Sequence, residues 1–90
     1  MTNERWQKFS PYEQIRNIGA ELERARMGKE RGNVLQFSGA LERAFEMIDF
    51  SLEDSRWRQD VLKLLVLRDE AANAYSGEKD ADIRALTRAL

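Results

Sequence analysis

The sequence predicts an all-α protein, an antiparallel bundle of three main helices with a short C-terminal fourth helix. Three observations lead to this fold class: apolar residues recur at intervals of three and four, only one proline and five glycines interrupt the chain, and no useful stretch alternates with period two. Ninety residues are enough for a single domain. A chain of this length buries only about 60% of its unfolded surface, so association with another chain would help to stabilise it.

The first main helix is predicted over residues 11–31. Ser10, Pro11 and Glu13 have the spacing of a capping box with proline at the first helical position. One apolar face follows at helical spacing, made of Ile15, Ile18, Leu22 and Ala25. Gly32 can supply the left-handed residue that ends the helix, and Gly32-Asn33 then forms a tight turn.

The second helix is predicted over residues 34–52, with Asn33 as its cap. Its main apolar stripe consists of Leu41, Phe45, Ile48 and Leu52. A second row widens that stripe to one side and consists of Phe37, Ala40, Ala44 and Met47. Because a wide apolar face can contact two neighbours, we expect this to be the central helix.

The third helix is predicted over residues 56–75, and a short fourth over 81–89. In the third helix several residues fall within about 60° of one direction, which is expected to face the core. They are Trp57, Val61, Leu64, Arg68, Ala71, Ala72 and Tyr75. The fourth helix would present Ile83, Leu86 and Leu90 on one side.

Composition excludes several classes of function. The chain has no cysteine and no histidine, which removes Ser-His-Asp and Cys-His catalysis and every zinc site built on imidazole or sulfur. A net charge of −1 argues against a dominant field for nucleic acid or an anionic membrane. No apolar run approaches about 18 residues and no secretory signal is evident. We therefore expect a cytoplasmic protein that uses no cofactor or metal, has no catalytic residues and does not bind a membrane.

Two arginines fall on helix faces that are otherwise apolar. Arg68 lies in the core-facing sector of the third helix, and Arg26 projects onto the apolar line of the first. The favoured interpretation is an ion pair from Arg68 to Glu46 or Asp49 at the rim of the core. One alternative is a carboxylate or phosphate site formed by Arg68, Arg26 and Tyr75. Another is a role for Arg68 at an interface.

An acidic stripe on the second helix contains Glu42, Glu46, Asp49 and Glu53. Carboxylates at helical spacing can bind Mg²⁺ or Ca²⁺, or act as an acid and base pair. No second carboxylate motif completes such a site, so the stripe is predicted to be a solvated helix face.

Apolar side chains outside the predicted core point to a partner. Leu62 and Val66 project about 120° or more away from the Arg68 sector and give the third helix a second apolar face. Residues 83–90 of the same chain or a second protein would have to cover it. Trp6 and Phe9, which precede the first cap, are either a lid over the end of the bundle or aromatic anchors of an interface.

Three segments carry a family resemblance: "NIGAELERA" at 17–25, "ALERAFEMIDFSLEDSRW" at 40–57 and "LLVLRDEAANAY" at 64–75. In residue spacing they resemble an uncharacterised family of small bacterial helical proteins. The resemblance implies a compact helical fold and no established activity.

The functional prediction is an interaction module and not an enzyme. A second copy of the chain is the favoured partner, and another protein is the alternative. A second class of function also fits the sequence, a small regulator that binds nucleic acid or an anionic ligand through arginines. Those arginines would be Arg24, Arg26, Arg56, Arg58 and Arg68.

Overall fold

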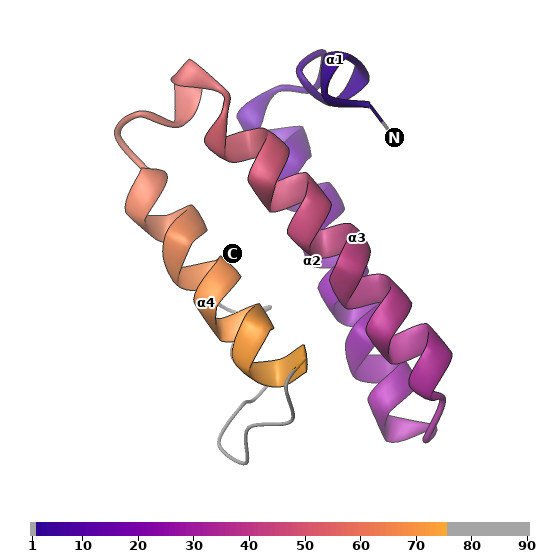
Figure 1. Ribbon diagram of the computed structural model, residues 1–90. Coiled ribbons are helices and arrows are strands. Elements are labelled where there is room, and N and C mark those ends of the chain that lie inside the picture. The colour runs from indigo at the N-terminus through magenta and orange to yellow at the C-terminus, as the bar shows by residue number, and fades with distance from the viewer. Residues whose placement is uncertain (1, 76–90) are drawn as a thin grey trace.

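The computed structural model describes residues 2–75 of the chain, and every regular element in that part is helical. In chain order the elements are α1 (Asn3–Trp6), α2 (Pro11–Glu30), α3 (Val34–Leu52), the 3₁₀ helix η1 (Ser55–Trp57) and α4 (Val61–Tyr75). The three long helices α2, α3 and α4 run antiparallel to their chain neighbours (Figure 1), which confirms the predicted all-α bundle. The helix predicted over 81–89 lies outside the described residues.

Local capping signals determine where α2 and α3 begin. The Ser10 hydroxyl accepts a hydrogen bond from the Glu13 backbone N–H (3.2 Å), and the Glu13 carboxylate accepts one from the Ser10 N–H (3.0 Å), so the predicted capping box is confirmed. Gly32 has φ +70°, and the Asn33 side chain accepts from the Gln36 N–H (3.0 Å). This hairpin turn sets α3 directly against α2.

α3 is the central helix, because both α2 and α4 pack against it. The fully buried residues of the three helices form one apolar core and include Ile18, Leu22, Ala25, Ala40, Leu41, Ala44, Ile48, Leu64, Leu67 and Ala71. α2 and α3 approach each other closely at Gly28, where an added Cβ would lie 2.7 Å from the backbone nitrogen of Phe37. A side chain at that position would push the two helices apart.

The third main helix, α4, begins at Val61, later than the predicted residue 56. Asp54 accepts a hydrogen bond from the Arg56 backbone N–H (2.9 Å) and so caps η1 instead of a long helix. A turn over residues 58–60 separates η1 from α4. Because of this turn, the direction in which the Trp57 side chain points does not follow from the helical periodicity of α4.

The buried face of α4 differs in phase from the predicted sector. Its buried residues are Leu64, Leu67, Ala71 and Ala74, whereas Tyr75 is 46% exposed. Including Tyr75 in the core-facing sector was wrong, because the prediction extended one helix through Trp57.

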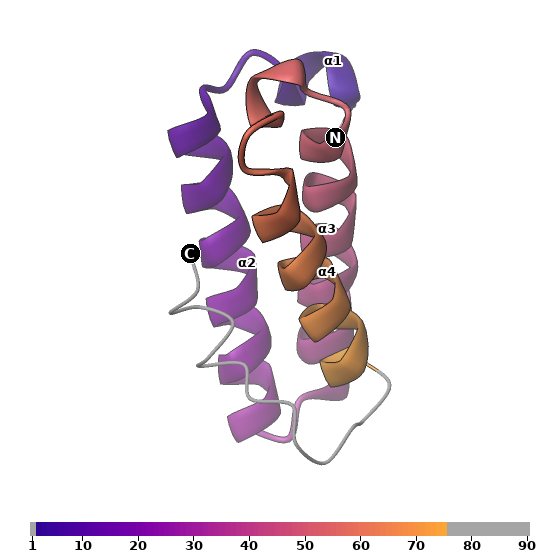
Figure 2. The same cartoon turned by 90° about the vertical axis from the view of Figure 1, so that its left-hand side faces the viewer.

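The opposite ends of the bundle have different structures (Figure 2). At one end α1 and η1 lie beside the start of α2 and the end of α3, and the other end is formed by the α2–α3 hairpin and the last turn of α4. None of the described helices is long and apolar enough to cross a membrane.

Candidate functional site

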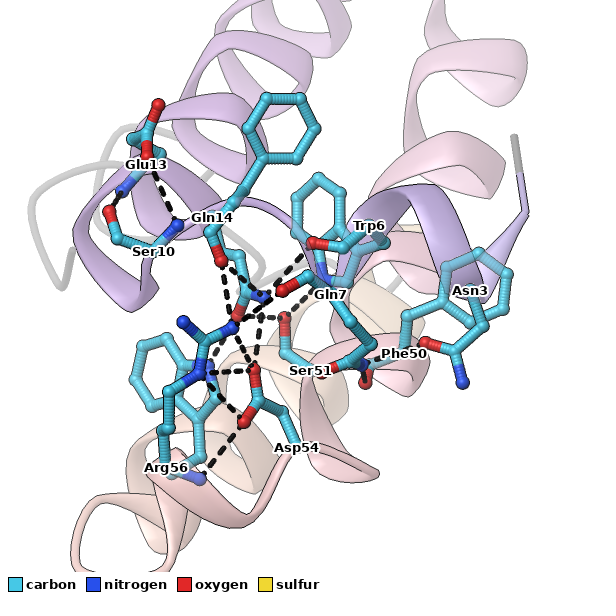
Figure 3. A network of polar contacts seen from close by, with 12 residues as sticks. Asn3, Trp6, Gln7, Ser10, Glu13, Gln14, Phe50, Ser51, Asp54 and Arg56 are labelled. Carbon is cyan, nitrogen blue, oxygen red and sulfur yellow. Dashed lines mark hydrogen bonds and ion pairs between the residues drawn. The ribbon is translucent and has the colours of Figure 1, made fainter.

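A buried polar network surrounds Gln14 at the end of the bundle that carries α1 and η1 (Figure 3). We call it the Gln14 network, with members Trp6, Gln14, Ser51, Asp54, Arg56 and Trp57. Gln14 is fully buried, and its side-chain oxygen accepts from the Trp57 indole N–H (2.6 Å) and the Ser51 hydroxyl (3.2 Å). Its amide nitrogen donates to the Asp54 carboxylate (3.2 Å). One amide thus connects α2, α3 and η1.

The two tryptophans have parallel roles in this network. The Trp6 indole N–H donates to Ser51 Oγ (2.9 Å), and the Ser51 hydroxyl lies within hydrogen-bond distance of the Met47 carbonyl oxygen (2.9 Å) as well as of Gln14. In the part of the chain that the structure describes, no buried side-chain nitrogen or oxygen lacks a hydrogen-bond partner. The network is therefore saturated by the protein itself, which is typical of a structural clamp.

The charged pair of the network holds the N-terminal segment in place. Asp54 is buried, and the Arg56 guanidinium that donates to it lowers its pKa to about 2. The same guanidinium donates to the backbone carbonyls of Gln7 (3.0 Å) and Phe9 (2.8 Å). Hydrogen bonding to Asp54 in turn raises the pKa of Arg56. Arg56 is thus committed to its own chain.

Trp6 and Phe9 lie at this end of the bundle. Trp6 is fully buried, Phe9 is half-buried against the core, and their rings meet edge to face with centroids 5.6 Å apart. Trp6 has no exposed surface to offer a partner, which favours a lid over the bundle end, whereas Phe9 keeps part of its surface exposed.

The side chain of Arg68 lies at the seam between α4 and α3. Its Nε donates to Asp49 (2.6 Å), which raises the pKa of Arg68, and its guanidinium carbon lies 5.8 Å from the centre of the Phe45 ring. Tyr75 closes the seam, with its hydroxyl donating to Glu42 (3.0 Å) and its ring edge against Phe45. The hydrogen bond to Glu42 raises the pKa of Tyr75. These contacts are those of a rim ion pair.

Arg26 does not join that seam. It pairs along α2 with Glu23 and with Glu30 (2.7 Å), and the hydrogen bond to Glu23 raises its pKa. Arg68, Arg26 and Tyr75 each have their own carboxylate partner, so the contacts favour separate ion pairs over a shared anion site. Glu46 is exposed on α3 and also takes part in a polar interaction.

Most of the arginines proposed to bind nucleic acid are likewise neutralised. Arg24 pairs with Glu21, and Arg43 reaches the same carboxylate across the α2–α3 interface (2.9 Å). The Glu21 side chain is buried, and its carboxylate pairs with both guanidinium groups. Within residues 2–75, no three carboxylates gather in the way that a metal ion requires.

A shallow cleft of about 270 Å³ lies between the start of α2 and the start of α4. Ile15 and Trp57 contribute apolar surface to it, and Tyr12 also lines it. Its charged residues are Asp60, Lys63 and Arg56, of which Arg56 is paired with Asp54. The mixture of charges favours neither an anion nor a cation, so the cleft has no clear ligand.

The outer face of α4, which we define as Leu62, Leu65 and Val66, is apolar and exposed. These side chains are 73%, 42% and 54% exposed. They follow helical spacing i, i+3, i+4 and lie opposite the buried row of Leu64, Leu67, Ala71 and Ala74. The exposure predicted for Leu62 and Val66 is present, and Leu65 adds to it.

The Gln14 network was missed by sequence reasoning. Gln14 precedes Ile18 by one helical turn on the apolar face of α2, so its position in phase with the core was a usable signal. Its partners Ser51 and Trp57 lie 37 and 43 residues away in sequence. Only the fold shows that they meet.

Comparison of the chain with protein-family models, curated proteins and solved structures finds no match. The resemblance to small bacterial helical proteins therefore stays a prediction.

Proposed function

We propose that this protein is a non-catalytic interaction module, and that it associates with a second copy of itself through the outer face of α4. The observation that carries the proposal is the shared exposure of Leu62, Leu65 and Val66 on the side of α4 that faces away from the core. Contiguous exposed aliphatic side chains on one helix face are a feature of surfaces that bind other proteins.

The size of this face implies weak and reversible association. Complete burial of a leucine or valine side chain is worth about 1.5 to 3 kcal/mol. Because the three side chains are already partly buried, covering them gives about 3 to 5 kcal/mol per copy. Association costs about 4 to 15 kcal/mol in lost freedom. Even at the low end of that cost, the net gain for two copies is at most about 6 kcal/mol, so the dimer would have a dissociation constant of tens of micromolar or weaker and would not be permanent.

The other classes of function receive less support. The chain has no histidine or cysteine for catalysis. Arg24, Arg26, Arg56 and Arg68 are paired with carboxylates, which weakens the alternative of a nucleic-acid or anion-binding regulator. The absence of cysteine agrees with the reducing cytoplasm, where we propose that the module acts.

The test is sedimentation equilibrium of the full chain from about 10 µM to 1 mM, a range that brackets the expected dissociation constant. The wild type should rise in average mass with concentration. A variant carrying Leu62→Glu and Val66→Glu should remain monomeric, because two buried charges without partners would oppose contact.

A matched control is available at the other end of the bundle. Val34 and Leu35 are 72% and 85% exposed in the first turn of α3, so Val34→Glu with Leu35→Glu makes the same chemical change away from Leu62 and Val66. This control should associate like the wild type. A monomeric wild type over the whole range, or loss of association in the control alone, would contradict the proposal.

A further inference from the structure

Residues 2–9, which we call the N-terminal strap, form a short segment that lies against the end of the bundle carrying η1 (Figure 3). The strap consists of α1 and the turn that follows it. Trp6 is fully buried, whereas Glu4, Arg5 and Lys8 are exposed. A helix as short as α1 is not stable without packing partners, so the strap depends on its contacts with the bundle.

The bundle binds the backbone of the strap through two side chains. The Arg56 guanidinium on η1 donates to the carbonyl oxygens of Gln7 (3.0 Å) and Phe9 (2.8 Å). The Gln14 amide nitrogen on α2 lies within hydrogen-bond distance of the carbonyl oxygens of Trp6 and Phe9 (3.3 Å each). These contacts resemble those by which a receptor holds a bound peptide, because they recognise main-chain oxygens.

The side chains of the strap bind to the C-terminal end of α3. The Trp6 indole N–H donates to the Ser51 hydroxyl (2.9 Å), and the Gln7 amide donates to the Phe50 carbonyl oxygen (2.9 Å). Asn3 donates to Glu53, the residue that caps α3. Together with the two side chains that bind the backbone, these partners define what we call the strap site: Gln14, Phe50, Ser51, Glu53 and Arg56.

The buried polar groups of the strap site keep partners inside the bundle when the strap is removed. Gln14 still accepts from Trp57 (2.6 Å) and donates to Asp54 (3.2 Å). Arg56 still pairs with Asp54, and the Ser51 hydroxyl still reaches a main-chain carbonyl of α3 (2.9 Å). Water would hydrate the polar groups of the released strap. Departure of the strap therefore leaves no buried polar group without a partner, a penalty that usually holds a segment in place.

The remaining cost of release is the exposure of aromatic surface. Trp6 is the only fully buried side chain among residues 2–9, and Phe9 is half-buried. Burial of one aromatic anchor is opposed by the conformational entropy that the strap loses when it is ordered, and the two quantities are similar in size. Segments with this balance open locally while the rest of a protein stays folded.

We propose that the N-terminal strap is a detachable intramolecular ligand, which leaves the strap site while α2, α3 and α4 stay folded, and that the vacant site binds the same segment from a second copy. The site selects a short segment with aromatic side chains at i and i+3, here Trp6 and Phe9, whose backbone carbonyls are free to accept. A second copy supplies this segment without any new kind of contact, as in the exchange of an identical element between protomers. This contact does not involve the outer face of α4.

Peptide complementation on the full chain tests the proposal. The chain carrying Trp6→Ala keeps its strap but loses the aromatic anchor, and a labelled peptide of residues 2–10 with blocked ends is added. The variant should stay folded by circular dichroism. In fluorescence anisotropy it should bind the peptide at least about 10-fold more tightly than the wild type, whose own tethered strap competes at an effective concentration on the order of millimolar.

Matched controls locate the peptide at the strap site. A peptide that itself carries Trp6→Ala should not bind. Adding Arg56→Lys to the Trp6→Ala chain should weaken peptide binding about 10-fold, because an ammonium group lacks the planar fork of donors that holds two carbonyls and a carboxylate together. Arg43→Lys makes the same change at the α2–α3 interface, where Arg43 pairs with Glu21, and should leave peptide binding unchanged.

Hydrogen exchange of the wild type gives a second measurement that needs no substitution. The Trp6 indole N–H should exchange through local opening, so its protection should be at least about 10-fold lower than that of the Ile48 backbone N–H and should change little with urea. The Ile48 N–H, in the core of α3, should follow global unfolding and depend steeply on urea.

The contrary results are equally specific. A folded Trp6→Ala chain that does not bind the peptide would overturn the proposal. Unfolding of that variant, together with the same urea dependence for the Trp6 and Ile48 protons in the wild type, would show that the strap is an integral part of the fold and would overturn it as well.

Discussion

Replacement of Gln14 by leucine should destabilise the protein, because the indole N–H of Trp57 would lose its hydrogen-bond acceptor. The Gln14 side-chain oxygen is the acceptor for the Trp57 N–H at 2.6 Å, and Trp57 is only 4% exposed. Leucine has a similar volume, so the change removes the acceptor and opens little space. The Trp57 N–H would then be buried without a partner.

The expected loss of stability follows from the partners that remain. Ser51 still reaches the Met47 carbonyl, and Asp54 still has Arg56, so only the Trp57 donor is stranded. A buried donor without a partner costs about 1 to 3 kcal/mol, and the other lost hydrogen bonds add about 1 kcal/mol. The total of about 2 to 4 kcal/mol is a large part of the stability of a small domain and should lower the melting temperature by about 10 to 25 °C.

The measurement is thermal and urea unfolding followed by circular dichroism, with Trp57→Phe as the second arm of a double-mutant cycle. Phenylalanine removes the stranded N–H, so Gln14→Leu should cost about 1 to 2 kcal/mol less in that background. An unchanged cost in both backgrounds would show that the indole hydrogen bond does not account for the loss. A wild-type melting temperature for Gln14→Leu would refute the buried network altogether.

Three further outcomes are expected. The pKa of Asp54 lies near 2, below its usual value of 3.8, so ionised Asp54 stabilises the fold by about 2 kcal/mol above pH 4. This contribution should disappear as the pH falls toward 2. Acid unfolding of the Asp54→Asn variant should therefore lack the loss of stability between pH 4 and pH 2. Gly28→Ala should cost about 1 to 3 kcal/mol in urea unfolding, because its Cβ would lie 2.7 Å from the Phe37 nitrogen, whereas Gly39→Ala meets only ordinary contacts and should be neutral or stabilising. Ile48→Ala in the core should cost about 2 to 5 kcal/mol, and a near wild-type urea midpoint would contradict its burial.

Local chemistry made much of the fold predictable. The bonds that start α2 and α3 join Ser10 to Glu13 and Asn33 to Gln36, each only three residues apart, so the sequence carries the whole signal. The apolar spacing that placed Ile48 in the core likewise depends on one helix alone. Features of this kind do not require knowledge of which segments meet.

Long-range contacts were less accessible. The start of α4 could not be located from spacing, because η1 interrupts the predicted helix and places the Trp57 indole against Gln14, a contact made across the bundle. Arg68 shows the intermediate case: its position on the helix predicted an ion pair to α3 at Glu46 or Asp49, and the structure gives Asp49. The exposure of Leu62 and Val66 was predictable from phase, whereas no local signal identifies what contacts them.

The Gln14 network also determines which part of the molecule tryptophan fluorescence reports on. The chain has only two tryptophans, Trp6 and Trp57, and both indole nitrogens are hydrogen-bonded within this one cluster. Intrinsic fluorescence therefore observes a single end of the bundle, while far-ultraviolet circular dichroism averages over all the helices. If α1 and η1 detach before the long helices melt, the emission will shift to longer wavelength while the helical signal is still intact, and the two probes will give different midpoints. Coincident midpoints would mean that this end opens only when the whole bundle does.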